Sequence, residues 1–136
     1  MQTFLPNLGF RKSAQLLDDR RLGKQRVETL QILNVLVRGH GGWVNHPAVR
    51  MWRGYEPALV RYGTAMIEEW TARGFKNTMN LKLAFPQYTE HDVVYIPWLT
   101  EDLCASHRAN LLRKDPRFYS KFEWTEDPNT PYLWPV

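Results

Sequence analysis

A chain of 136 residues with 43% hydrophobic and 13% aromatic residues is long enough to bury one hydrophobic core and too short for two ordinary domains. The single cysteine, Cys104, excludes an internal disulfide, and the sequence shows no apolar leader and no long uncharged apolar run. We therefore expect one soluble intracellular domain that covers residues 1–136.

The formal net charge of +4 comes from one part of the chain. Residues 11–38 hold seven of the eighteen Lys and Arg residues but only three of the fourteen acidic residues, and the remainder holds eleven of each. A basic excess on one element suits an anionic partner such as a nucleic acid backbone, because phosphate contacts by Lys and Arg give sequence-independent affinity. A solvated helix face explains the same count equally well.

The first third of the chain predicts an extended arm followed by a long helix. The opening residues MQTFLPNLGF are apolar and interrupted by proline and glycine, so they predict an arm packed on the body. A short helical turn over residues 11–17 follows. Asp18 or Asp19 then caps a helix that runs to about Arg38, where the glycines of GHGGW end it. The apolar positions of this helix fall in one sector and predict its core stripe: Leu22, Val27, Leu30, Leu33 and Val37.

Proline and capping residues predict three further helices, since proline fits a first helical turn better than an interior one. They begin after Pro47, after Pro57 and at Thr100 or Glu101, and Gly74 and Asp115 close the last two.

The segment before the last of these helices, residues 76–97, predicts one short helical piece at most and a possible extended stretch at Val93 and Val94. The tail after residue 115 is rich in aromatics and proline, so it is expected to fold back over the body. The pattern as a whole predicts an all-α fold: a compact single domain of four to five helices with an extended N-terminal arm and an aromatic C-terminal tail.

Charged residues of the long helix form two groups. Arg21, Lys24 and Glu28 share one face beside the apolar stripe, where they could hold a carboxylate against a cationic site. The alternative is an ordinary exposed ion pair between Lys24 and Glu28, worth a few tenths of a kcal/mol. Asp19 and Arg26 fall on the apolar side, which predicts a buried or half-buried pair.

No metal site is expected. The four histidines, His40, His46, His91 and His107, have no paired spacing and no accompanying cysteine pair. The tripeptide Ser106-His107-Arg108 places three polar side chains in sequence on a helix, so at least one of them should reach a surface or cleft. A polar helix flank is the plainer explanation. Most of the eighteen aromatic residues must be core, and a few near the basic helix could stack on bases.

The segment LLDDRRLGKQRVETL resembles the first long helix of the phage endonuclease V family, the pyrimidine-dimer DNA glycosylases. EPALVRYGTAMIEEWTARGF is similar to that family's second long helix, and YIPWLTEDLCASHRANLLRKDPRFYSKF to its last helix and aromatic tail. The resemblance implies a compact all-α fold, a DNA partner with a damaged, modified or abasic site, no cofactor, no metal and no membrane. It also leads us to expect a monomeric, cytoplasmic, nucleoid-associated enzyme that removes a base and then cuts the strand as an abasic-site (AP) lyase.

Members of that family use the α-amine of the chain as nucleophile and one glutamate of the first long helix, which the resemblance places at Glu28. The bulky second residue, Gln2, usually keeps the initiator methionine in place, so Met1 carries the candidate amine. An α-amine titrates near neutrality, about two units below a lysine, and is therefore available for attack on the sugar. Glu28 would stabilise positive charge on the sugar and shuttle protons.

Three positions depart from the family pattern. Its arginines align with Val27 and Gln31, and its histidine aligns with Arg21. These departures favour another damaged or modified base over a pyrimidine dimer as the substrate. DNA contacts are expected instead from the basic side chains Arg20, Arg21, Lys24, Arg26, His107 and Arg108.

Two alternatives remain open at this point. The scaffold could serve as a non-catalytic nucleic-acid-binding domain, or Lys24, one helical turn before Glu28, could replace the α-amine as nucleophile.

Overall fold

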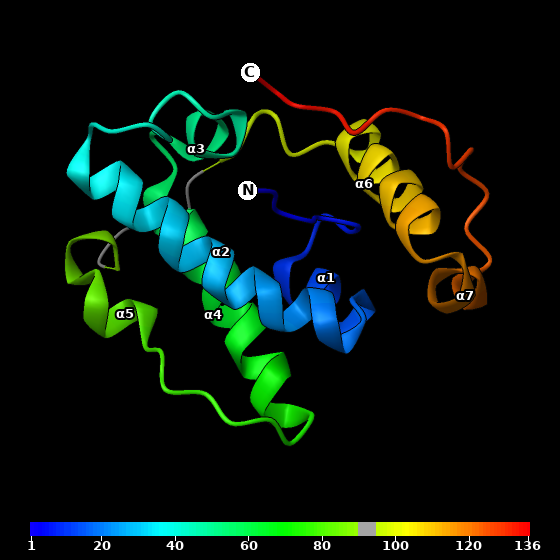
Figure 1. Ribbon diagram of the computed structural model, residues 1–136, viewed down its shortest axis with the longest axis horizontal. Coiled ribbons are helices and arrows are strands. Elements are labelled where there is room, and N and C mark those ends of the chain that lie inside the picture. The colour runs from blue at the N-terminus through cyan, green and yellow to red at the C-terminus, as the bar shows by residue number, and fades with distance from the viewer. Residues whose placement is uncertain (90–94) are drawn as a thin grey trace.

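The structure is a computed structural model that describes residues 1–89 and 95–136, and the described residues form helices without any strand (Figure 1). Four helices of seven residues or more make the body: α1 (Phe10–Leu16), α2 (Asp19–Arg38), α4 (Glu56–Ala72) and α6 (Glu101–Lys114). Shorter pieces complete the described chain: helices α3 (Pro47–Trp52), α5 (Leu81–Ala84) and α7 (Pro116–Tyr119), and the 3-10 turns Pro86–Tyr88 and Ser120–Phe122. The predicted all-α class is confirmed, and α5 and α7 are single turns. The extended stretch predicted at Val93 and Val94 lies outside the described residues.

Local sequence signals set the helix ends as predicted. The side chain of Asp18 accepts from the backbone N–H of Arg21 at 3.3 Å and caps α2, and Gly39, with φ of 74°, ends it in the left-handed region. Thr100 caps α6 in the same way by accepting from Leu103 N–H at 3.2 Å. These signals fix the start and end of α2 and the start of α6.

Helices α2 and α4 cross at close range and form the centre of the core (Figure 1). Gly63 of α4 makes this possible, because a Cβ atom there would lie 2.5 Å from Thr29 of α2 and 2.4 Å from Leu81. Large side chains that are fully buried surround the crossing: Leu22, Ile32, Leu33, Trp52, Leu59, Tyr62 and Met66.

The core face of α2 is rotated relative to the predicted stripe. Leu22 and Leu33 are buried, but Val27 and Val37 are 41% and 51% exposed. Two polar residues, Gln25 and Thr29, lie inside in their place. The prediction that the two valines are buried was wrong. It assumed that only apolar residues of α2 face inward, whereas a buried segment beside α2 requires hydrogen-bonding partners from this helix.

That element is the N-terminal arm, whose residues 3–6 are buried without regular secondary structure. Its N–H groups therefore bond to side chains. Phe4 N–H donates to Oε1 of Gln25 at 3.0 Å and lies 3.1 Å from the hydroxyl oxygen of Tyr62, and Leu5 N–H donates to Nδ1 of His107 at 2.9 Å. The Tyr62 hydroxyl is also 2.7 Å from the carbonyl oxygen of Phe4. Helices α2, α4 and α6 thus each supply a partner to the arm.

Side chains also bond to three further polar groups of the arm. Nε2 of Gln25 donates to the carbonyl of Gln2 at 3.0 Å, and the hydroxyl of Tyr132 donates to the carbonyl of Thr3. The indole N–H of Trp52 donates to the Thr3 hydroxyl at 3.2 Å. Burial of the arm is therefore compatible with its polar backbone only because these particular side chains face it.

The C-terminal tail folds back over the body, as predicted. Leu133 N–H donates to the Ser106 hydroxyl of α6 at 3.0 Å, and the ring of Tyr132 stacks on His107 with centroids 4.0 Å apart. The tail thus supports the arm from the side opposite α2 (Figure 1).

The arm gives a first prediction. The Tyr62 hydroxyl lies 2.7 Å from both the Phe4 carbonyl and Oε1 of Gln25, so Tyr62→Phe removes the donor from a buried acceptor, and the free energy of unfolding should fall by about 1–3 kcal/mol. Urea titration measures this loss. The matched control is Tyr95→Phe, which removes the same hydroxyl from a side chain that is 81% exposed and should leave stability unchanged. Equal effects of the two substitutions would contradict the role assigned to Tyr62.

Candidate active site

The start of the chain meets Glu28 at the surface of α2. The backbone N–H of Gln2 donates to Oε2 of Glu28 at 2.9 Å, and both Met1 and Glu28 are half-buried. No ion pair joins Lys24 to Glu28 within residues 1–89 and 95–136, so the ordinary i, i+4 pair is not what holds this carboxylate. The structure thus brings together the two residues predicted to be catalytic.

Glu28 separates two hollows. The larger has a volume of about 400 Å³, and we call it the aromatic hollow. It is lined by Met1, Glu28, Gln31, Asn34, Val35, Arg38 and Trp43. Gln31 and Asn34 follow Glu28 on the same face of α2, and Trp43 comes from the loop after that helix. A pocket of this size, with an aromatic wall and a few polar groups, can hold a small planar ligand beside the carboxylate.

The smaller hollow, of about 180 Å³, lies toward the start of α2, and we call it the basic hollow. It is lined by Gln2, Phe4, Arg20, Arg21, Lys24, Gln25, Glu28 and Lys114. Arg21 is partly neutralised, because its guanidinium lies 3.3 Å from Asp18 and 3.7 Å from Asp115. No ion pair of Arg20, Lys24 or Lys114 occurs in the described part of the chain, so these three cations remain available for an anion.

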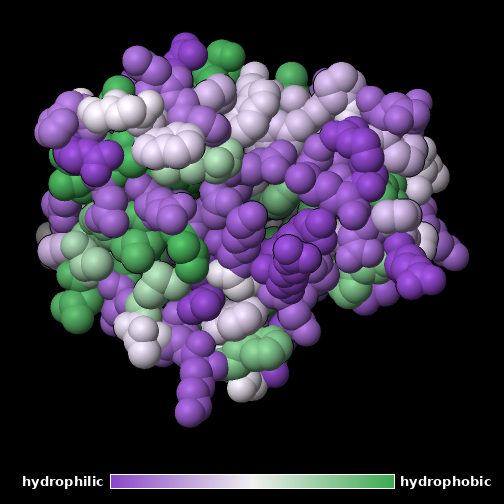
Figure 2. All heavy atoms as spheres, viewed as in Figure 1, coloured by the Kyte–Doolittle hydropathy of each residue, from purple (hydrophilic) through white to green (hydrophobic). Residues whose placement is uncertain are grey.

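The two hollows follow one another along α2 and share Glu28, and together we call them the α2 groove. The residues that line it, from Arg21 to Arg38, recur every three or four positions, so the groove follows the helix for about 25 Å. In Figure 2, hydrophilic residues gather over the N-terminal half of α2 and beside α6, whereas hydrophobic residues gather on the side of α5. A groove with phosphate-binding charge at one end and an aromatic ring at the other fits a nucleic acid strand.

His46 lies close to the α-amine and to Glu28. Burial lowers the pKa of His46, the positive α-amine lowers it further, and the carboxylate of Glu28 opposes both. Nδ1 of His46 accepts from Ala48 N–H at 3.0 Å, which caps α3, and the ring contacts Trp43 at 5.6 Å and Trp134 at 6.0 Å. The imidazole is therefore held neutral behind the wall of the aromatic hollow.

Arg26 and Arg108 lie elsewhere. The guanidinium of Arg26 stacks over Trp70 at 4.5 Å and donates to Asn77 at 2.6 Å, so the pair expected with Asp19 does not form. Asp19 pairs instead with Arg73, at 2.9 Å.

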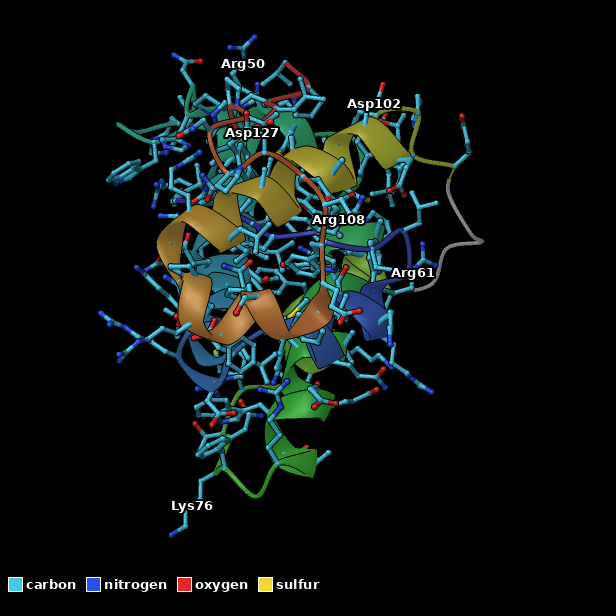
Figure 3. The ribbon with its side chains drawn as sticks, turned by 90° about the vertical axis from the view of Figure 1, so that its right-hand side faces the viewer. Arg50, Arg61, Lys76, Asp102, Arg108 and Asp127 are labelled. Carbon is cyan, nitrogen blue, oxygen red and sulfur yellow. The ribbon has the colours of Figure 1, made fainter. Side chains whose placement is uncertain are left out.

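Arg108 is 15% exposed in its side chain and is held by Glu101, Glu126 and the carbonyl of Pro6. Figure 3 shows it beside the N-terminal arm, between α6 and the tail. The structure places neither Arg26 nor Arg108 in the α2 groove.

His107 does not reach the surface. Its side chain is fully buried, accepts from Leu5 N–H and stacks on Tyr132, so the structure assigns it to support of the arm instead of DNA contact. Burial lowers the pKa of His107 to about 3, which keeps the imidazole neutral.

Lys114 is the functional candidate that the sequence did not reveal. It is the last residue of α6, 86 positions after Glu28, and only the packing of α6 beside the arm brings it to the basic hollow. A basic residue in the last turn of a helix is ordinary, so no local pattern marks it.

Within residues 1–89 and 95–136, no group of three or more His, Cys, Asp or Glu side chains could hold a metal ion. In the same part of the chain, no helix combines the length and apolar character needed to cross a membrane.

Comparison with known proteins identifies one family. The family model described as pyrimidine dimer DNA glycosylase matches residues 1–83, which is more than half of the chain. The match includes the arm, helices α1–α4 and every residue that lines the aromatic hollow. The resemblance expected for residues 95–122 lies outside it. No curated protein and no solved structure matched the chain.

The buried histidine gives a second prediction. Because the pKa of His107 is lower in the folded protein than its ordinary 6.5, the folded state binds fewer protons, and stability falls as the pH drops from 6.5 toward 3. We expect about 2 kcal/mol of this loss between pH 7 and pH 5. His107→Gln keeps an acceptor for Leu5 N–H but cannot titrate, so its stability should change less over this interval.

Urea titrations of both proteins at pH 7 and pH 5 measure the difference. Hydrogen bonds from Tyr119 and Arg21 outweigh burial and lower the pKa of Asp18 from 3.8, so its contribution is lost only at lower pH. An identical pH response of His107→Gln and the unchanged protein would show that the imidazole is not held neutral.

Proposed function

The chain belongs to the pyrimidine dimer DNA glycosylase family, and on this premise we propose that it excises a damaged or modified base from DNA and then cleaves the strand as an AP lyase. The observation that carries the proposal is the hydrogen bond from Gln2 N–H to Glu28 Oε2, which holds the start of the chain beside a carboxylate in a nucleic-acid-sized groove.

The chemistry begins with the unprotonated α-amine. Its nitrogen attacks C1′ of the sugar, the glycosidic bond breaks, and the base leaves with the bonding electrons and takes up a proton. The carboxylate of Glu28 stabilises the positive charge that develops on the sugar. Opening of the sugar ring then gives a protonated Schiff base between the chain and C1′.

The lyase step uses the same carboxylate. Removal of a proton from C2′ by Glu28 allows the 3′ phosphate to leave by β-elimination, and water then hydrolyses the Schiff base and frees the enzyme. Oε2 of Glu28 is bound to Gln2, while Oε1 has no hydrogen bond within the described residues and is available for these proton transfers. No step requires a cofactor.

Either of the first two residues could supply the amine. With Met1 retained, the residue that carries the α-amine lines the aromatic hollow together with Glu28. If the methionine is removed, the nitrogen of Gln2, which lies 2.9 Å from Oε2, becomes the α-amine. Both forms place an amine at Glu28.

The phosphates flanking the attacked sugar would occupy the basic hollow, where Arg20, Lys24 and Lys114 are free of ion pairs in the described residues. We propose a monomeric, cytoplasmic enzyme that is associated with the nucleoid through this charge.

A third prediction tests the mechanism. Borohydride should trap the protein on a duplex that carries one abasic site, and peptide mass spectrometry should place the adduct on the α-amine of Met1 or Gln2. Acetylation of the N-terminus should abolish the adduct, and Glu28→Gln, which keeps an acceptor for Gln2 N–H, should slow strand cleavage by about 10²- to 10⁴-fold. Glu68→Gln is the control, because this exposed glutamate on α4 lines neither hollow.

The outcomes separate the alternatives. An adduct that survives N-terminal acetylation and maps to Lys24 would move the nucleophile to that side chain. DNA binding without any adduct would leave a non-catalytic nucleic-acid-binding domain.

A fourth prediction concerns the basic hollow. Lys114→Ala should remove one phosphate contact, which weakens duplex binding and reduces the slope of log K against log salt by about 0.9. Fluorescence anisotropy at salt concentrations from about 50 to about 200 mM measures this slope. Lys76→Ala is the matched control. Lys76 lies at the lower end of the molecule in Figure 3 and lines neither hollow. Equal slopes for the two variants would exclude a phosphate at Lys114.

A further inference from the structure

The two hollows beside Glu28 differ in chemistry, and the difference bears on what the enzyme recognises. Arg20, Arg21, Lys24 and Lys114 line the basic hollow, whereas the aromatic hollow has one arginine, two amide side chains and a tryptophan. Charge suits phosphate, which carries no sequence information, while amides and aromatic rings suit the edges and faces of bases.

We propose that the aromatic hollow is a base-recognition pocket that receives a single extruded nucleobase, stacked on Trp43 and hydrogen-bonded by the side-chain amides of Gln31 and Asn34. This inference rests on the proposed function and narrows it. The substrate class is one modified base with a hydrogen-bonding edge, which leaves the duplex with its own sugar.

Trp43 is the stacking platform. Its side chain is 53% exposed, which is unusual for so large an apolar ring. The ring centroid lies 5.6 Å from that of His46, and the His46 ring in turn lies 6.0 Å from Trp134. The His46 ring is itself fixed by its hydrogen bond from Ala48 N–H. An aromatic ring that lines a pocket, is half exposed and is held by neighbouring rings can present a face to a base.

Gln31 and Asn34 are placed to read the edge of that base. They lie three residues apart on α2, so they share a face, about 4.5 and 9 Å along the helix axis from Glu28. Both are exposed, and the described residues provide no hydrogen bond to either amide. Each amide offers one acceptor and two donors, and asparagine and glutamine can bind a base edge with two hydrogen bonds.

The position of the pocket identifies which base it holds. Met1 and Glu28 both line the aromatic hollow, so a sugar attacked there would direct its own base toward Gln31 and Trp43. Extrusion into the protein is also what exposure of C1′ requires, since this carbon is inaccessible within a stacked duplex.

The test compares bulges that differ only in the presence of a base. Five duplexes carry one unpaired nucleotide, which is A, C, G, T or a tetrahydrofuran abasic analogue, and fluorescence anisotropy gives the affinity of each. The protein should bind at least one base bulge more tightly than the tetrahydrofuran bulge. Trp43→Ala should reduce that preference about fivefold or more, the range expected for loss of one base stack.

Two further variants complete the design. Replacing both amides, with Gln31→Met and Asn34→Leu, should reduce discrimination among the four bases by about fivefold or more. Val37→Ala, at an exposed position of α2 outside both hollows, should preserve the affinities for all five duplexes.

Two results would overturn the inference. One is equal affinity of the unchanged protein for the tetrahydrofuran bulge and all four base bulges. The other is an equal loss of affinity for base and tetrahydrofuran bulges in Trp43→Ala, which would make Trp43 a backbone contact. Borohydride trapping on an abasic duplex is run in parallel. If an adduct forms on the α-amine and either of these results is obtained, only the base pocket is contradicted. If no adduct forms, the proposed glycosylase and lyase function itself is contradicted.

Discussion

The structure depends on one constraint: a segment without secondary structure is buried at the centre of a helical protein, and its backbone must still be hydrogen-bonded. Residues 3–6 lie between α2, α4 and α6, where no neighbouring strand is available. An unpaired buried N–H or carbonyl costs about as much as a lost hydrogen bond, so several of them would exceed what marginal stability tolerates. Side chains from three helices and the tail solve the problem. The arrangement of those helices is consequently tied to the path of the arm.

This constraint explains why α2 is an unusual core helix. One face carries Leu22 and Leu33 into the hydrophobic core, and an adjacent face carries Gln25 inward to the arm. Glu28 lies three residues further along, at the point where the arm emerges at the surface. The charged residues at the start of this helix therefore have two roles. Asp18 caps the helix, and the basic residues that follow it line the basic hollow. Helix α2 thus supplies part of the core, the support of the arm and the carboxylate proposed to be catalytic.

Local signals predicted the helices well and the site only in part. A capping aspartate, a terminating glycine and prolines in first turns act over a few residues, so the sequence alone located α2, α3, α4 and α6. The resemblance located Glu28 and Met1, which the structure brings together. Burial of Gln25 and His107 and the approach of Lys114 are set by contacts between residues 21 to 102 positions apart or by the packing of α6. The periodicity of a sequence does not show such contacts. The sequence therefore predicted a DNA contact for His107, although its side chain is fully buried.

The same constraint has a consequence for catalysis. Ordering a free chain terminus costs about 1–2 kcal/mol per residue in conformational entropy, and a nucleophile on a mobile terminus would incur that cost each time a substrate bound. Here the arm is ordered by the core contacts of Phe4 and Leu5, so the cost is met when the protein folds. In the proposed mechanism the amine and Glu28 would therefore meet the sugar already oriented, which is the condition under which intramolecular reactions gain most. Because the hydroxyl of Tyr62 holds Phe4 of the arm and its side chain is fully buried away from both hollows, a substitution of Tyr62 should lower both the stability and the rate of Schiff-base formation expected from the proposed mechanism.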